Sequence, residues 1–118
     1  MRVLLFIDLM KIEKVIQMHG QEIGDLLLEN TGLRISSQLR SSDYIFRFEG
    51  NRFAVLLPKV ANKLDAGTVA NKIHQKITIP YNFKGSDINI SCSIGAAVYP
   101  DDGTTRETLI QNAMSAMI

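Results

Sequence analysis

The sequence has no tryptophan, one cysteine and three prolines among its 118 residues. A single cysteine, Cys92, excludes an intramolecular disulfide bond. The chain is nevertheless long enough to fold around an apolar core as one compact domain. Apolar and polar residues alternate around Cys92, and this pattern predicts a small core residue rather than a reactive thiol. A chain with so little cysteine suits a reducing compartment, and we expect a cytoplasmic one.

The sequence also lacks a large net charge, because its 13 Lys and Arg residues nearly balance its 12 Asp and Glu residues. We therefore expect neither nucleic acid nor an anionic membrane as a partner. No apolar run approaches the roughly 20 residues that span a bilayer. The apolar stretch at the start of the chain ends at Asp8, and it predicts a buried strand rather than a signal peptide. The two histidines, His19 and His74, lack the spacing of metal ligands.

Periodic patterns of apolar residues are present along the whole chain. They predict helices at 11–18, 21–39 and 62–77, a β-hairpin at 44–58, and strands at 2–8, 79–83 and 87–98. Thr104 and Glu107 form a capping box, which predicts a last helix. Helices that alternate with hairpins indicate an α+β domain in which helices cover a sheet.

The hairpin carries a resemblance to a known family. Residues 47–58 read R-F-E-G-N-R-F-A-V-L-L-P and resemble the R-x-G-G-D-E-F-A-V-L-L-P hairpin of GGDEF domains, the diguanylate cyclase fold. Segments 5–9, 20–25 and 93–100 resemble the first strand, the G-H-x-x-G-D segment and the S-I-G-I-A-x-Y-P strand of that family, in the same order. The resemblance implies a sandwich like that of nucleotidyl cyclases, with a mostly antiparallel central sheet of about five strands flanked by helices.

The resemblance covers nearly all of residues 1–118, which we interpret as a single domain. The family's opening D-x-L-T-x-L-x-N-R segment would precede Met1, and its lysine after the last helix would follow Ile118. Relative to the family, the domain is therefore expected to be truncated at both ends.

The catalytic positions of the family are altered in this sequence. GGDEF domains join two GTP molecules into cyclic di-GMP, and carboxylates hold the divalent metals that this phosphoryl transfer needs. Asp8 matches the first of these carboxylates. At the turn, Gly50 matches the family, but Glu49 replaces a glycine, and Asn51 and Arg52 replace the two acidic residues. We therefore expect no enzymatic activity, no magnesium site and no cofactor.

Nucleotide recognition also looks altered. Ile16 occupies the position of an asparagine that contacts guanine in the family, and an aliphatic side chain cannot hydrogen-bond a base. Asp25 matches the second guanine-contacting position and is the remnant of that site. We expect GTP to bind poorly here.

One ligand site of the family is matched. Arg40 and Asp43 reproduce the R-x-x-D motif of the inhibitory site, which binds cyclic di-GMP in active members. The guanidinium group of arginine can donate two hydrogen bonds to a guanine edge or to a phosphate, and the carboxylate of aspartate can accept hydrogen bonds from guanine N–H groups. The alternative is structural, with Asp43 capping a turn or pairing with a nearby arginine.

The resulting interpretation is a catalytically inactive regulatory domain in cyclic di-GMP signalling, acting beside neighbouring domains of a larger protein. Two alternatives stay open. One is a pure interaction module that forms a homodimer or regulates an attached domain such as a phosphodiesterase. The other is a weak diguanylate cyclase.

Overall fold

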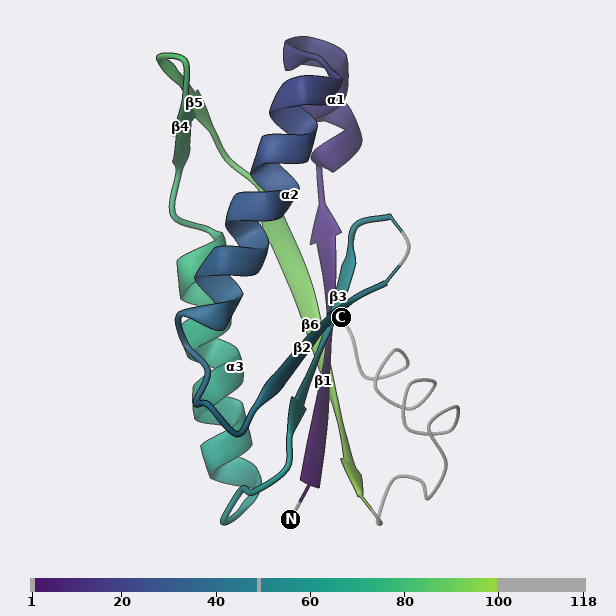
Figure 1. Ribbon diagram of the computed structural model, residues 1–118, viewed down its shortest axis with the longest axis vertical. Helices are drawn as coiled ribbons and strands as arrows, with labels where there is room; N and C mark the ends of the chain where they lie inside the picture. Colours follow the sequence, from purple (N-terminus) through teal and green to yellow (C-terminus); the bar gives the residue numbers. More distant parts are fainter. Residues whose placement is uncertain (1, 49, 100–118) are drawn as a thin grey trace.

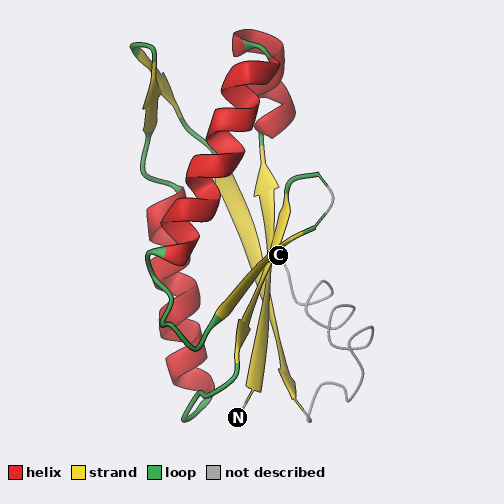
Figure 2. Ribbon diagram, in the orientation of Figure 1, coloured by secondary structure: helices red, strands yellow, loops and turns green. Residues whose placement is uncertain are grey.

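The computed structural model describes residues 2–48 and 50–99 (Figures 1 and 2). In chain order the elements are β1 (Arg2–Met10), α1 (Ile12–His19), α2 (Gln21–Ser36), β2 (Tyr44–Arg47), β3 (Arg52–Leu57), α3 (Lys63–Ile77), β4 (Tyr81–Phe83), β5 (Ser86–Ile88) and β6 (Ser91–Tyr99). The α+β class is confirmed.

The central sheet has the strand order β2-β3-β1-β6, and each neighbouring pair is antiparallel. β1 lies between β3 and β6, which explains why its sequence is almost continuously apolar. Helices α2 and α3 lie on the same side of the sheet (Figure 2). Side chains of that sheet face and of both helices form one core cluster, which includes Leu5, Ile7, Leu27, Val55 and Ile73.

Strand β6 begins later than the sequence predicted. The expected strand at 87–98 is two strands, because residues 86–88 pair with 81–83 in a separate two-stranded sheet. Ile88, Ile90 and Cys92 are all buried across the break. Alternating apolar and polar residues indicate which side chains are buried, but they do not indicate which neighbouring strand is hydrogen-bonded. The sequence pattern therefore could not show where the chain changes from one sheet to the other. Within the described ranges the central sheet therefore has four strands.

Helix α2 ends at Ser36, whereas its apolar pattern predicted an end near Leu39. The backbone N–H of Gln38 donates to the carbonyl oxygen of Ile35, and that of Leu39 to Ser36, each at 3.0 Å. Such i to i+3 bonds tighten the last turn of a helix. The predicted last helix, with Thr104 and Glu107, lies outside the described residues.

A guanidinium joins α2 to the segment that follows α3. Arg34 donates hydrogen bonds to three main-chain carbonyl oxygens, those of Lys76, Ile79 and Pro80. Its guanidinium carbon also lies 3.4 Å from the centre of the Tyr81 ring. The Tyr81 hydroxyl in turn shares a 3.1 Å hydrogen bond with the buried hydroxyl of Thr31. One side chain thus fixes where the chain leaves α3 and enters the β4–β5 hairpin.

Cys92 is 6% exposed, which confirms that it is a core residue, and desolvation by burial raises the pKa of its thiol to about 11. The unfolded chain loses this proton near pH 9, so unfolding is increasingly favoured as pH rises from about 9 to 11. Burial also raises the pKa of the Tyr81 hydroxyl, which acts in the same direction. We expect the denaturant concentration at the unfolding midpoint to decrease as pH rises across this window, and Cys92→Val to make that decrease smaller.

We also expect a thiol reagent at pH 8 to label Cys92 far more slowly in the folded protein than in the unfolded protein. Equal labelling rates would contradict the burial.

Candidate functional site

Main-chain hydrogen bonds hold the turn between β2 and β3, and one of them joins the turn to the adjacent end of β1. The backbone N–H of Leu9 donates to the carbonyl oxygen of Asn51 at 2.9 Å, and that of Phe48 donates to Arg52 at 2.8 Å. Gly50 has a φ of 65°, in the left-handed region that favours glycine. The turn therefore keeps its backbone beside the end of β1 even though its side chains differ from the family pattern.

Asp8 and Arg52 face each other across the sheet. They are register partners of β1 and β3, and Arg52 Nε lies 3.8 Å from Asp8 Oδ2. The two side chains are partly exposed, at 34% for Asp8 and 39% for Arg52. The Arg52 guanidinium also lies 6.0 Å from the centre of the Phe6 ring. An exposed pair of this kind contributes little stability, but it places a positive charge beside the carboxylate that matches the family's metal ligand.

Among the described residues, the side chains around Asp8 offer few of the ligands that a magnesium ion prefers. Magnesium prefers several hard oxygen ligands, carboxylates above all. Within residues 2–48 and 50–99, no group of three or more His, Cys, Asp or Glu side chains could hold a metal. Asp8 is also the ion-pair partner of a guanidinium, which repels a dication. Glu49, which replaces a glycine of the family pattern, lies outside the described residues.

The predicted nucleotide remnant lies where α1 packs on α2. A Cβ built at Gly24 would lie only 2.5 Å from Ile16 Cγ1, so the isoleucine packs directly onto the glycine. Asp25 is exposed and accepts a 2.9 Å hydrogen bond from Gln21 Nε2. Of the two guanine-contacting positions of the family, only Asp25 therefore offers a hydrogen-bonding side chain.

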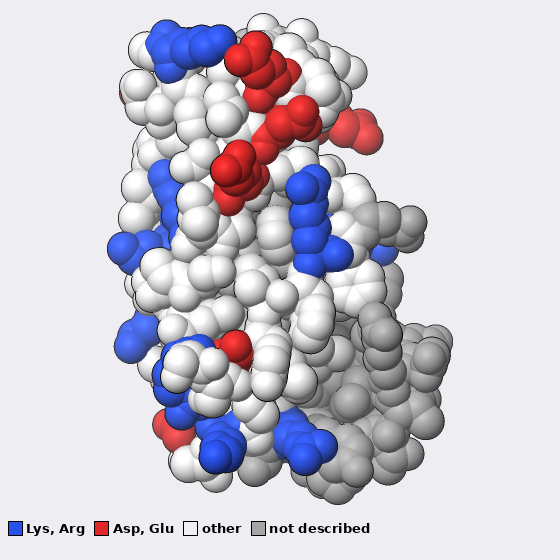
Figure 3. Space-filling view, viewed as in Figure 1, with Lys and Arg blue, Asp and Glu red and all other residues white. Residues whose placement is uncertain are grey.

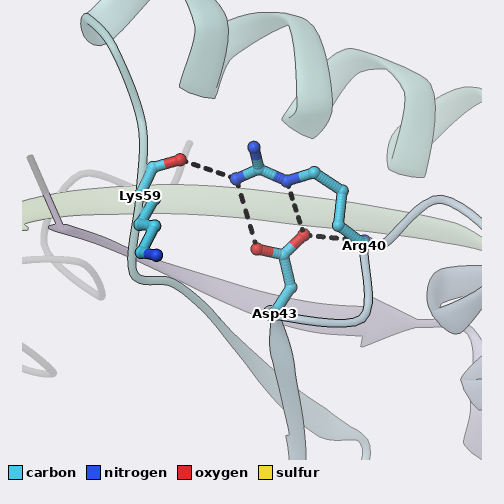
Figure 4. Close-up of polar contacts among 3 residues, drawn as sticks. All are labelled: Arg40, Asp43 and Lys59. Carbon is cyan, nitrogen blue, oxygen red and sulfur yellow. Dashed lines mark hydrogen bonds and ion pairs between the residues drawn. The ribbon is translucent and has the colours of Figure 1, made fainter.

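Arg40 and Asp43 are brought together in the turn between α2 and β2 (Figure 4). The backbone N–H of Arg40 donates to Asp43 Oδ2 at 2.8 Å, and the backbone N–H of Asp43 donates to the Arg40 carbonyl oxygen at 3.0 Å. The guanidinium lies 3.5 Å from the same carboxylate, and its Nη2 donates to the Lys59 carbonyl oxygen at 2.6 Å. The Asp43 side chain is 3% exposed and the Arg40 side chain 60%.

This geometry separates the roles of the two residues. Asp43 caps the turn and pairs with Arg40, so the structural role that the sequence left open is present. Arg40 keeps most of its side chain accessible while its guanidinium is held in place. Asp25, by contrast, lies near the other end of α2 and does not belong to this site.

A shallow hollow of about 300 Å³ lies between α3 and the sheet. Its lining is Val3, Leu5, Lys63, Ala66, Gly67, Ala70, Ala96 and Val98. It lacks the convergent polar groups that a purine nucleotide needs. The hollow does not add a ligand site to those above.

Charges are unevenly distributed on the face shown in Figure 3, although Lys84 Nζ lies 3.5 Å from Glu22 Oε1 at the acidic end. Acidic side chains gather over α1 and the upper part of α2, while several basic side chains lie at the opposite end (Figure 3). The exposed acidic residues of α2 include Glu22, Asp25 and Glu29. Their spacing of three and four residues places them on one helix face, and this signal was readable in the sequence.

Residues 1–118 match the family described as "Diguanylate cyclase, GGDEF domain". The chain therefore belongs to the GGDEF family, as the hairpin, the first strand and the 93–100 segment predicted. No helix among the described elements is both long and apolar enough to cross a membrane.

Relatives of this chain are parts of larger signalling proteins. It is 42% identical over 113 residues to the bifunctional diguanylate cyclase/cyclic di-GMP phosphodiesterase MucR of Pseudomonas aeruginosa, covering 96% of this chain but 16% of MucR. The crystal structure of the GGDEF domain of TpbB from the same species matches with a TM-score of 0.92 at 35% identity, covering 98% of this chain and 72% of that one. An EAL/GGDEF domain protein from M. capsulatus matches with a TM-score of 0.91 at 39% identity, covering 98% and 75%.

Proposed function

We propose that this GGDEF domain is a non-catalytic regulatory module of cyclic di-GMP signalling and binds no magnesium. The Asp8–Arg52 ion pair carries the proposal. Phosphoryl transfer between two GTP molecules requires neutralisation of triphosphate charge beside the attacking hydroxyl. Here the carboxylate at the matching strand position is paired with a side-chain cation instead, and Asn51 carries no charge. The domain would act in a reducing cytoplasm, where cyclic di-GMP is made and degraded.

The ligand proposed for the module is cyclic di-GMP, held through Arg40. The exposed guanidinium is already oriented by Asp43 and by the Lys59 carbonyl oxygen. A preoriented guanidinium loses less side-chain freedom on binding a guanine edge or a phosphate. Asp43 has little exposed surface, so its main contribution is to hold Arg40 in position.

Calorimetry tests this proposal directly. Cyclic di-GMP titrated into the domain is expected to bind saturably in the micromolar range, and Arg40→Ala is expected to weaken binding at least tenfold, because about 1.4 kcal/mol or more of charge-assisted hydrogen bonding is lost. Lys72→Ala removes an equal charge from an exposed position of α3 and serves as the matched control. No heat from a domain whose melting curve shows it folded would eliminate the sensor role.

A second candidate is a module that acts only through protein contacts. The observation that favours it is the size of the relatives, because the chain spans 16% of MucR and 26% of TpbB. An attached phosphodiesterase domain is the partner we would test first. Its rate of cyclic di-GMP hydrolysis should change when this domain is deleted, and should not change with Arg40→Ala if ligand binding plays no part.

A further inference from the structure

Strand β2 leaves one edge of the central sheet unpaired. β3 is its neighbour on one side, and no strand within the described part of the chain pairs with the other side. The Phe48–Arg52 hydrogen bond shows that even-numbered residues of β2 point their backbone groups at β3. In an antiparallel ladder the direction alternates, so the N–H and C=O groups of Ile45 and Arg47 point outward. Such groups form a template for another strand.

The same strand exposes two aromatic rings. Tyr44 is 56% exposed and Phe46 50% exposed, and their rings are stacked with centroids 6.4 Å apart at an interplanar angle of 18°. Both lie on the sheet face opposite the α2–α3 core, whereas Ile45 packs against that core. The sequence pattern predicted a strand here, but it did not show that its aromatic side chains remain accessible.

We propose that the β2 edge pairs with the β2 edge of a second copy of this chain. A two-fold axis at Ile45 would place the outward N–H and C=O groups of each Ile45 opposite each other, as a hydrogen-bonded pair. This register sets Tyr44 against Phe46 of the second copy, and Phe46 against its Tyr44. These are non-hydrogen-bonded pairs, whose side chains approach most closely and whose aromatic contacts are favourable.

The sequence 43–47, D-Y-I-F-R, is complementary to itself in this register. Asp43, which precedes β2, would lie opposite Arg47 of the second copy at each end, but its side chain is only 3% exposed and adds no ion pair across the interface. Arg40 already pairs with Asp43, and the aromatic contacts therefore contribute more than the charges. The pairing would join two four-stranded sheets into one continuous sheet.

The interface is small, so the isolated domain should associate weakly. A single short strand pair buries less area than a standard stable interface, and we expect a dissociation constant on the order of hundreds of micromolar. Two such domains held together by attached domains would pair more completely, because tethering raises their effective concentration. The pairing requires no cyclic di-GMP, so it is measured without the ligand and stands apart from the proposed function.

Sedimentation equilibrium from about 10 µM to about 1 mM tests the association. The average mass of the wild-type domain should rise with concentration. Phe46→Lys should weaken the dimer at least tenfold, since lysine at an edge strand opposes pairing. Leu33→Lys, at a 62% exposed position on α2, is the matched control and should leave the mass curve unchanged. A monomer at the highest concentration, or a dimer that Phe46→Lys leaves intact, would overturn the proposal.

Disulfide trapping tests the register. A mixture of Tyr44→Cys and Phe46→Cys proteins should crosslink rapidly, because the paired positions lie within disulfide reach. Each variant alone should crosslink much more slowly, because equal positions in the two copies are diagonal neighbours about 7–8 Å apart. The native Cys92 is buried and should not compete. Crosslinking no faster in the mixture than in either single variant would exclude this register.

Discussion

No cyclic di-GMP is expected when the purified domain is incubated with GTP and magnesium. Enzymes of this kind obtain most of their rate from metal ions and oriented charges around the phosphates. Among the matching positions that the structure describes, Asp8 on β1 is the one carboxylate, it is paired with Arg52, and Asn51 carries no charge. Losses of such groups are not additive, and the combined deficit should exceed about 10⁴-fold in rate relative to an intact turn. Chromatographic detection of cyclic di-GMP after prolonged incubation measures it.

The control is a diguanylate cyclase with an intact G-G-D-E-F turn, assayed at the same concentration and ionic strength. A trace of product from the domain is informative only if it depends on the site, so Asp8→Asn is assayed beside it. Magnesium-dependent turnover that disappears in Asp8→Asn would show a weak cyclase and overturn the non-catalytic proposal. Turnover that Asp8→Asn leaves unchanged would point to a contaminating enzyme.

Replacing Arg34 with alanine should lower the free energy of unfolding by about 2–3 kcal/mol, because hydrogen bonds from a charged donor to three carbonyl oxygens and the contact with Tyr81 are lost together. The carbonyl oxygens lie at the surface and can accept from water, which limits the loss. For a domain of this size the melting temperature should fall by about 10 °C. Chemical denaturation followed by circular dichroism gives the free energy.

Arg34→Lys separates charge from shape. A lysine keeps the positive charge, but its ammonium group cannot donate hydrogen bonds to all of these carbonyl oxygens and cannot stack flat on the Tyr81 ring. We therefore expect it to recover less than half of the stability lost in Arg34→Ala. Lys72→Ala provides the baseline for losing one exposed cation, within about 0.5 kcal/mol of the wild type. Full recovery by lysine would mean that charge alone matters at this position.

Much of the fold could be predicted because its elements have strong local signals. Helix α3 was expected at 62–77 and spans Lys63–Ile77, with Asn62 accepting from the backbone N–H of Asp65 as its N-cap. The glycine in the turn and the alternating aromatic residues gave the hairpin of β2 and β3. The failures were at boundaries, where local periodicity continues past a change of partner, as between Ile88 and Ser91.

The candidate site was less accessible to sequence reasoning, because its properties depend on pairing between distant segments. The motif identified Arg40 and Asp43 but could not rank a ligand role against a structural one. In the folded domain Asp43 is buried and Arg40 is exposed, and the Lys59 carbonyl oxygen accepts a hydrogen bond from Arg40. A sequence motif lists side chains only, so it could not show this main-chain contact. Asp8 and Arg52 are likewise 44 positions apart in the chain, and only the strand register makes them neighbours.

The turn that holds Arg40 runs directly into β2, since Asp43 is followed at once by Tyr44. A ligand on Arg40 and a second copy on the β2 edge would therefore act on consecutive residues of one short segment. Thermodynamic linkage makes the two events reciprocal. If bound cyclic di-GMP changes the affinity of the dimer by some factor, dimerisation must change the affinity for cyclic di-GMP by the same factor. A seven-residue stretch, 40–46, could in this way convert the concentration of a small molecule into a change of assembly state without any catalytic step.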